Sequence, residues 1–346
     1  MTPQPALAPE PLTNRDAYRL RWKRRRLLWR SWRSRHHLSA RTNRTDQIAA
    51  GDVLAVTVLR NEIQRLPFFL SHYRRLGVAH FLMVDNASDD GSAEFLARQR
   101  DVSLWHTDHS YHASRFGLDW LTWLQMKFAP GHWCLMVDAD ETLIYAHHDQ
   151  RGLRELTAWL NTQGCGAFGA LMLDLYPKGP LNEARYGPGQ DPIEALQWFD
   201  AGPYRSVRQP PLGNLWVQGG ARERMFFADD PRRSPTLNKL PLVRWNKTYA
   251  YVNSCHSVLP PRLNRAYDGP GGSQPSGVLL HSKFLPDIVS RSETEKIRQQ
   301  HFHTPQDFDR YYDQLIAAPD LWHDKSVRIR DWQQLERLGL MNSGGW

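Results

Sequence analysis

The chain is poor in cysteine and lacks any long apolar run. Its 346 residues include only Cys134, Cys165 and Cys255, which are widely separated and form no Cys-x-x-Cys pair. This odd number excludes a framework of paired disulfides and suggests a reducing compartment. No stretch approaches the roughly 20 apolar residues of a membrane-spanning helix, and the N-terminus has no apolar signal-peptide core. We therefore expect neither a transmembrane helix nor a secretory signal.

Positive charge is also scarce outside one end of the chain. Residues 1–50 carry twelve Lys or Arg and three acidic residues, whereas the remaining residues carry 32 and 33. The net charge of +8 therefore comes from the N-terminal tail, and the body is close to neutral. The composition, 41% hydrophobic and 23% charged, is that of a globular enzyme and excludes a disordered chain.

The tail, residues 1–50, combines a Pro-rich start that we expect to be disordered with a basic aromatic segment at 15–36. On a helix, one side of this segment carries an apolar group interrupted only by Arg25, namely Tyr18, Trp22, Leu28, Trp29 and Trp32. Such a helix suits an anionic membrane surface, with its rings at headgroup depth. A solvated basic arm and a nucleic-acid-binding arm are the alternatives, and the tryptophans favour the membrane.

From residue 52 the pattern alternates between strands and helices. Apolar runs predict strands at 53–59, 80–85, 102–106 and 132–138, and the stretches between them predict helices at 61–76, 92–99 and 113–128. This order indicates an α/β fold with a mainly parallel sheet and helices on both faces. Later stretches predict a helix at 151–163, strands at 166–176, 240–245 and 277–284, long loops at 177–236 and an amphipathic C-terminal helical segment at 287–317.

Polar motifs follow three of the predicted parallel strands. Asp138-Ala139-Asp140-Glu141 ends the fourth, Asp85-Asn86 opens a turn after the second, and Asn61-Glu62 follows the first. Ligands of open α/β sheets bind outside the carboxyl ends of the strands, and paired carboxylates there suit a hard divalent cation. A plain turn with a helix cap remains the alternative for each motif taken alone.

Together, these motifs resemble glycosyltransferase family 2, in particular a bacterial subgroup with an Asn-Glu opening and a DADE metal motif. The resemblance covers roughly residues 53–315, and softer matches follow at 219–224, 237–245 and 279–284. It implies a GT-A fold, a nucleotide-diphosphate sugar donor and a cofactor of Mn2+ or Mg2+. The implied organisation is a tail at 1–50, a catalytic domain at 51–285 and a C-terminal helical extension at 286–346.

The resemblance also assigns roles to residues. Asn61, Glu62, Asp85 and Asn86 would bind the nucleotide, and Asp138 would face the ribose or sugar. The metal would be held by Asp140, with Asp138 and a late histidine, His281. Arg115 and Lys239 would contact the diphosphate or nucleotide. Inversion at the sugar needs a general base, for which Glu223 comes first and Asp174 second.

The expected function is thus an inverting, metal-dependent glycosyltransferase of surface polysaccharide or glycolipid synthesis. Its partners would be the donor, a glycan or glycolipid acceptor and the anionic inner face of the cell membrane, which would make it a cytoplasmic, peripheral protein. The alternative is a non-catalytic nucleotide- or glycan-binding scaffold on the same fold. Nucleic-acid binding is disfavoured because the neutral body does not continue the basic surface of the tail.

Overall fold

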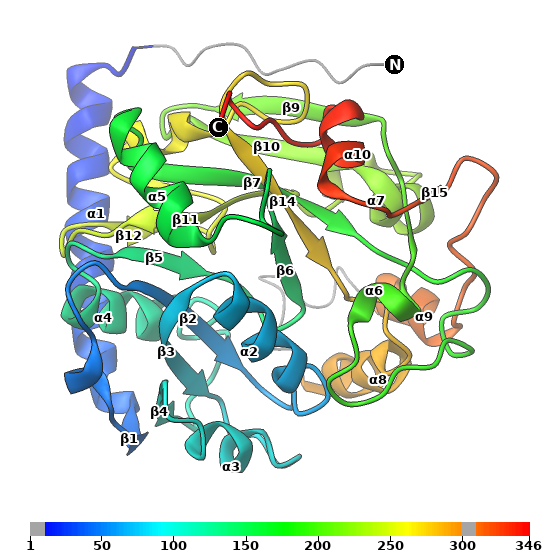
Figure 1. The fold of residues 1–346 in the computed structure, drawn as a ribbon, viewed down its shortest axis with the longest axis horizontal. Helices are drawn as coiled ribbons and strands as arrows, with labels where there is room; N and C mark the ends of the chain where they lie inside the picture. The colour runs from blue at the N-terminus through cyan, green and yellow to red at the C-terminus, as the bar shows by residue number, and fades with distance from the viewer. Residues whose placement is uncertain (1–10, 299–308) are drawn as a thin grey trace.

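The computed structural model describes residues 11–298 and 309–346, which are built around a nine-stranded sheet (Figure 1). Most of the Pro-rich start and the middle of the expected C-terminal helical segment lie outside the described residues. The strand order is β1-β4-β3-β2-β5-β11-β7-β14-β6. The strands are β1 (Ser39–Thr42), β2 (Val53–Leu59), β3 (Val78–Asp85), β4 (Val102–His106), β5 (Trp133–Met136), β6 (Glu141–Ile144), β7 (Ala167–Asp174), β11 (Asn238–Arg244) and β14 (Ser276–His281).

Most strands of this sheet point the same way. The pairs β4–β3, β3–β2 and β2–β5 are parallel, and so is β7–β14. β11 lies antiparallel between β5 and β7, and the edge strands β1 and β6 are antiparallel to their neighbours. The expected α/β class with a mainly parallel sheet is therefore confirmed. The carboxyl ends of six strands meet at one edge, where the polar motifs were expected.

Helices cover both faces of the sheet. Successive side chains of a strand point to opposite faces, so Leu54 and Val56 of β2 join one apolar cluster while Val53 and Ala55 join the other. The first cluster includes α4 (Leu118–Phe128) and α10 (Trp332–Arg337), and the second includes α2 (Leu66–Arg75), α3 (Ser92–Ala97) and α5 (Leu153–Thr162). This two-sided cover explains why all seven residues of β2 are buried.

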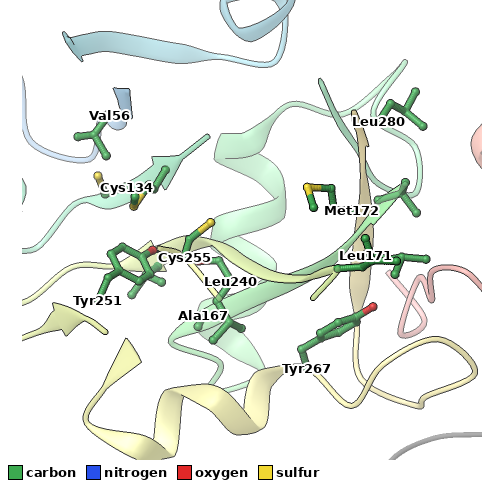
Figure 2. Packing of buried hydrophobic residues seen from close by; sticks show 14 of the residues in the cluster. Val56, Cys134, Ala167, Leu171, Met172, Leu240, Tyr251, Cys255, Tyr267 and Leu280 are labelled. Atoms are coloured by element: carbon green, nitrogen blue, oxygen red, sulfur yellow. Dashed lines mark hydrogen bonds between the residues drawn. The ribbon is translucent and has the colours of Figure 1, made fainter. Parts of the chain in front are cut away.

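Figure 2 shows the first cluster, where Cys134 of β5 and Cys255 lie near Tyr251. All three cysteines are free thiols, as expected. Burial raises the pKa of Cys134 and of Cys255 to about 12. Cys165 is only partly buried, and burial raises its pKa as well.

A glycine of β7 makes room for an aromatic ring of this core. A methyl group at Gly169 would stand 2.2 Å from the Cβ of Tyr267, far inside van der Waals contact. The ring of Tyr267, seen below β7 in Figure 2, is fully buried as a result. Even an alanine at position 169 would overpack this part of the core.

Two helices begin later than the sequence predicts. α2 starts at Leu66 rather than at residue 61, because Asn61 has a left-handed φ of 55° and caps no helix. α4 starts at Leu118 rather than at residue 113, since Arg115, Phe116 and Gly117 all have positive φ values of 56°, 58° and 75°. Three successive left-handed residues cannot continue a right-handed helix.

The stretch expected to be loops, residues 177–236, contains regular structure. Its main feature is an antiparallel hairpin of β9 (Tyr204–Gln209) and β10 (Asn214–Gly219), followed by α7 (Gly220–Phe226). The other elements of the described chain are α6 (Pro192–Ala195), β8 (Trp198–Phe199), β12 (Ala250–Tyr251), β13 (Val258–Leu259), α8 (Ile288–Arg298), α9 (Asp309–Ile316), β15 (Val327–Arg328) and the short 3-10 turns η1 (Arg35–His37), η2 (Thr45–Gln47), η3 (Pro231–Arg233) and η4 (Pro261–Ala266).

The N-terminal tail is attached to the body. α1 (Asn14–Ser34) forms the helix expected at 15–36 and packs along α4, and β1 pairs with β4 at the sheet edge. Leu20 and Leu27 are buried against Ala250 and Leu259, and Leu28 packs on the same cluster rather than joining the exposed rings. No helix among the described residues is long and apolar enough to cross a membrane. The expected boundary at residue 50 therefore coincides with no structural break.

Candidate active site

A cavity of about 470 Å³ opens at the carboxyl ends of the parallel strands. Leu59 of β2, Met136 of β5 and His281 of β14 mark the strand ends in its wall. Tyr111 and Phe116 close one side, and Ser234 and Pro235 contribute another. The predicted site residues that line it are Glu62, Asn86, Asp138, Asp140, Lys239 and His281.

The acidic motif after β5 places its side chains in different surroundings. The side chain of Asp138 is 46% exposed and lies 3.3 Å from Nζ of Lys239. Glu141 turns inward, where one carboxylate oxygen accepts a hydrogen bond from the backbone N–H of Asp138 and the other lies 2.8 Å from Nζ of Lys239. Glu141 thus fixes the turn, while Asp138 and Asp140 are left to face the cavity.

Asp140 and His281 stand side by side although 140 residues separate them. Nε2 of His281 lies 3.2 Å from Oδ2 of Asp140, and Nδ1 of His281 lies 2.6 Å from Oδ1 of Asp174. Strand pairing explains the meeting, because β14 carries His281 between Asp174, at the end of β7, and Glu141, at the start of β6. The Nε of Arg222 on α7 donates to Oδ2 of Asp174 at 2.7 Å.

Charge pairing sets the pKa values of this group. Burial alone would raise the pKa of Asp140, but His281 outweighs it and holds that pKa well below its usual value. Burial would also raise the pKa of Asp174, yet Arg222 and His281 lower it to about 2. For His281 the balance is reversed: burial lowers the pKa, and the two carboxylates raise it above its usual value. Asp140 and Asp174 are therefore ionised at neutral pH.

The pair of Asp140 and His281 has the chemistry of a partial cation site. Two ligands of one ion stand about 3 Å apart, which the oxygen and nitrogen here match. Nδ1 contacts Asp174 and Nε2 faces Asp140, as in metal-ligating histidines backed by a carboxylate. Within residues 11–298 and 309–346, no three His, Cys, Asp or Glu side chains form a metal-holding group.

The polar loops after β2 and β3 are tied to each other. Asn61 exchanges two hydrogen bonds with Asp89, one from its side-chain amide at 2.8 Å and one from the Asp89 backbone at 2.9 Å. Asp85 is fully buried beside Nδ1 of His106 at 2.9 Å, and Asn86 donates to the carbonyls at residues 107 and 109. Of the predicted nucleotide-binding residues, Glu62 and Asn86 reach the cavity, whereas Asn61 and Asp85 hold the loops behind it.

Glu62 also connects the cavity to the C-terminal helices. Its carboxylate pairs with Arg65 at 3.1 Å and with Arg291 of α8. Arg65 in turn makes a bidentate pair with Asp287, at 2.7 and 2.8 Å. The start of α8 is thereby fixed to the loop after β2, and Arg291 becomes part of the cavity wall.

Three other predicted site residues lie outside the cavity wall. Arg115 pairs with Asp119 at 2.7 Å and donates to the carbonyl of Tyr251. Glu223 accepts both N–H groups of Arg205, at 2.6 and 2.7 Å. Asp174 is held from both sides, as described above. The lowered pKa of Asp174 makes it a poor proton acceptor and speaks against it as the base. Glu223 is engaged by Arg205 and does not line the cavity.

Sequence reasoning missed most of the cationic wall. Besides Lys239 and Arg291, the cavity is lined by Arg60, Arg222, Arg232, Arg233, Lys283 and Arg298. Lys283 lies two residues after His281, and burial together with Arg222 lowers its pKa to about 8. Its position near the end of the strand predicted at 277–284 could have identified Lys283. Arg60 directly precedes Asn61-Glu62 after the first predicted strand, so its place was also open to prediction. The other arginines lie on segments whose packing the sequence pattern does not reveal.

Comparisons with known proteins add little to this picture. No protein-family model matches the chain, and no curated protein matches it. Among solved structures it is similar to a mannosyltransferase from Pyrobaculum calidifontis in complex with GDP-Man and Mn2+, at 16% identity over 45% of this chain and 46% of that one, with a TM-score of 0.28. The chain thus spans under half of that protein.

Two further structures are similar at comparable levels. A 4-diphosphocytidyl-2C-methyl-D-erythritol synthase matches at 16% identity over 40% of this chain and 65% of that one, with a TM-score of 0.25. A protein described as a glucose-1-phosphate thymidylyltransferase from Bacillus anthracis, in complex with sucrose, matches at 8% identity over 76% and 83%, with a TM-score of 0.28. Likeness this weak carries no conclusion about the reaction.

Proposed function

We propose that this protein is a metal-dependent glycosyltransferase that moves a sugar from a nucleotide-diphosphate donor to a hydroxyl group of a glycan or glycolipid acceptor. The sugar would leave the diphosphate and its anomeric centre would be inverted. One observation carries the proposal. In a cavity at the carboxyl ends of the parallel strands, Asp140 and His281 present an oxygen and a nitrogen 3.2 Å apart, with Asp174 behind the imidazole. A scaffold that only binds glycans has no need of this arrangement.

The residues present fit a divalent cation such as Mn2+. Imidazole is a better ligand for Mn2+ than for Mg2+. Asp140 and His281 would hold the ion, and Asp138 is the further carboxylate within the same motif. Such an ion offsets the negative charge that develops on a leaving diphosphate. Asp174 would keep the His281 ring oriented, with its Nε2 directed at Asp140.

The cationic wall would bind the diphosphate. Lys239 reaches Asp138, and Lys283 makes no ion pair within the part of the chain that the structure describes, so its ammonium group is available to a phosphate oxygen. Cations aimed at the leaving group stabilise the charge it acquires in the transition state. Glu62 and Asn86, which contact Arg291 and Arg60 of this wall, would also contact the nucleoside, on loops that Asn61 and Asp85 support.

A panel of nucleotide-diphosphate sugars would test the proposal. The full chain is heated with each donor in the presence of Mn2+, Mg2+ or EDTA, because a ligand that binds only the folded state raises the melting temperature. We expect one donor to stabilise the protein with Mn2+ and to lose most of that effect in EDTA. NMR of the sugar that a stabilising donor transfers to water, taken early in the reaction, should then show the inverted anomer. Absence of any metal-dependent shift across the panel would contradict the proposal.

A further inference from the structure

One face of α1 is buried against the body, and the opposite face is exposed. Its inner line, Leu20, Leu27, Ser31 and Ser34, is buried against the body. Its outer line carries rings that are mostly exposed, namely Tyr18 (60%), Trp22 (51%), Trp29 (54%) and Trp32 (45%). At 100° per residue the two lines lie about half a turn apart, so the rings point directly away from the protein.

This outer line collects most of the large apolar side chains that the described chain exposes. Seven such residues are exposed in residues 11–298 and 309–346, and four of them belong to the outer line of α1. Every tryptophan among the seven is there. A row of exposed indole rings along one helix is unusual for a surface that faces only water, and it indicates a binding surface.

The same helix is strongly cationic. α1 holds nine Lys or Arg and one Asp. Guanidinium groups stack on the exposed rings: Arg25 lies 5.2 Å from the Trp22 ring centre, and Arg33 lies 4.9 Å from that of Trp29. Just past the helix, Arg35 lies 3.7 Å from the ring centre of Trp32. Rings and cations therefore form one mixed surface, which we call the outer face of α1.

We propose that the outer face of α1 is a docking surface for an anionic phospholipid bilayer. Indole rings settle at the depth of lipid headgroups, and arginines beside them attract anionic headgroups. The helix of 21 residues is about 31 Å long and can lie flat on such a surface. This inference stands independently of the proposed sugar transfer.

Charge complementarity favours lipid over nucleic acid. Residues 51–346, with 32 bases and 33 acids, do not extend the basic surface, and a nucleic acid needs a cationic path along its backbone. The rings form a convex row instead of lining a groove, whereas proteins that stack bases on aromatic rings do so within a basic groove. A bilayer surface requires only one flat, cationic and aromatic face.

Because α1 is attached to the body, docking of α1 on a bilayer would also orient the cavity relative to that bilayer. Arg30 on the inner side pairs with Asp119 at 2.9 Å and donates to the carbonyl of Ala113 at 3.0 Å. Ala113 lies in the loop between Tyr111 and Phe116, both of which line the cavity. A bilayer bound to the outer face would therefore hold the cavity at a fixed orientation, in contrast to the tethering expected from a flexible tail.

Vesicle flotation of the full chain tests the proposal. The probes are vesicles of phosphatidylcholine alone and vesicles with one third phosphatidylglycerol, each at 0.05 M and 0.5 M salt. We expect at least tenfold stronger binding to the anionic vesicles at low salt, and most of it lost at high salt, because ionic screening shortens the reach of the arginines. Equal binding to both kinds of vesicle, or no binding to either, would overturn the proposal.

Variants locate the surface. Trp22→Ser/Trp29→Ser/Trp32→Ser should reduce anionic-vesicle binding at least tenfold and leave the melting temperature nearly unchanged, since the rings are exposed. The matched control is Val207→Ser/Ile297→Ser, which removes exposed apolar side chains elsewhere and should bind like the unmodified chain. If the triple variant fails to fold, Arg21→Glu/Arg26→Glu, at two exposed positions of α1, replaces it with the same expected loss.

Two other outcomes would show that the surface serves a different partner. Binding of a DNA duplex that the triple variant loses, without binding to anionic vesicles, would assign the outer face to nucleic acid. A dimer in sedimentation that the triple variant abolishes, again without vesicle binding, would assign it to a second copy of the chain. Either result would overturn the proposal.

Discussion

Asp174 supports the candidate site without lining the cavity. Its two oxygens accept from His281 at 2.6 Å and from Arg222 at 2.7 Å, and it is 4% exposed. Removing one charge of a buried pair leaves the other uncompensated. Asp174 therefore both stabilises a buried charge network and orients the ring that would bind the metal.

We predict that Asp174→Asn lowers the free energy of unfolding by about 3 kcal/mol and weakens Mn2+ binding 10- to 100-fold. Chemical denaturation and metal titration would measure the two effects. The matched control is Glu223→Gln, whose partner Arg205 is 48% exposed. That change should cost under about 1 kcal/mol and leave Mn2+ binding unaltered. Equal losses in both variants would show that Asp174 has no special part in the site.

Asp140→Asn is predicted to abolish sugar transfer and to remove the Mn2+-dependent part of donor binding. The substitution keeps the shape of the side chain and removes the charge that a cation needs. Calorimetric titration of the donor with and without Mn2+ would measure the loss. Asp149→Asn, at an exposed acid, serves as control and should behave like the unmodified chain. Full activity in Asp140→Asn would refute the metal assignment.

At the scale of elements, α1 is held by its leucines. Leu27 is 7% exposed and packs with Ala250 and Leu259. We predict that Leu27→Ala destabilises the protein by about 2 kcal/mol, through lost apolar burial and the cavity it leaves. Leu12→Ala, at a side chain that is 39% exposed, should change stability by under about 0.5 kcal/mol. Denaturation of both variants would show whether α1 unfolds with the body.

α2 carries a histidine that makes stability depend on pH. Nε2 of His72 donates to the carbonyl of Leu143 at 3.1 Å, and burial lowers the pKa of His72 to about 4. In the unfolded chain, His72 has its usual pKa of about 6.5 and is protonated below that pH. The contribution of His72 is therefore complete above pH 6.5 and is lost as the pH falls toward 4, by up to about 3 kcal/mol.

Gln in place of His72 can still donate to the same carbonyl but cannot bind the proton. We predict that His72→Gln reduces the slope of unfolding free energy against pH between pH 6.5 and 4 by the equivalent of about one bound proton. Urea denaturation across this range would measure the slope. The control is His36→Gln, at an exposed histidine of the N-terminal segment. An unchanged slope in His72→Gln would mean that other groups cause the loss of stability in acid.

For the whole molecule, the position of α1 changes what a truncation should do. Its sequence pattern suggests a tail separate from the folded body, whereas β1 joins the sheet and Arg30 pairs with Asp119. We predict that the fragment 51–346 melts at least roughly 5 °C lower than the full chain, since it exposes the apolar surface under α1. Equal melting of the fragment and the full chain would show that α1 adds no stability.

The sequence predicted the features that depend on local pattern. The buried strands, their parallel order and the acidic turn after β5 follow from apolar runs and chain order, and they place Asp138 and Asp140 at the cavity. It could not predict that Glu223 binds Arg205, or that Arg291 reaches Glu62. Such contacts depend on how distant elements pack. The late start of α4 was missed for another reason, because three left-handed residues override helix propensity there.

The distribution of thiols makes this chain ready for spectroscopic labelling. Cys134 and Cys255 are buried and stay protonated, whereas Cys165, between α5 and β7, is partly exposed. Maleimide and nitroxide reagents need an accessible thiol, and only Cys165 offers one, at a rate lowered by its raised pKa. One label per folded molecule is therefore expected without any engineered cysteine. A fluorophore at Cys165 and a quencher placed among the lipids would report how far that side of the body stands from a bilayer.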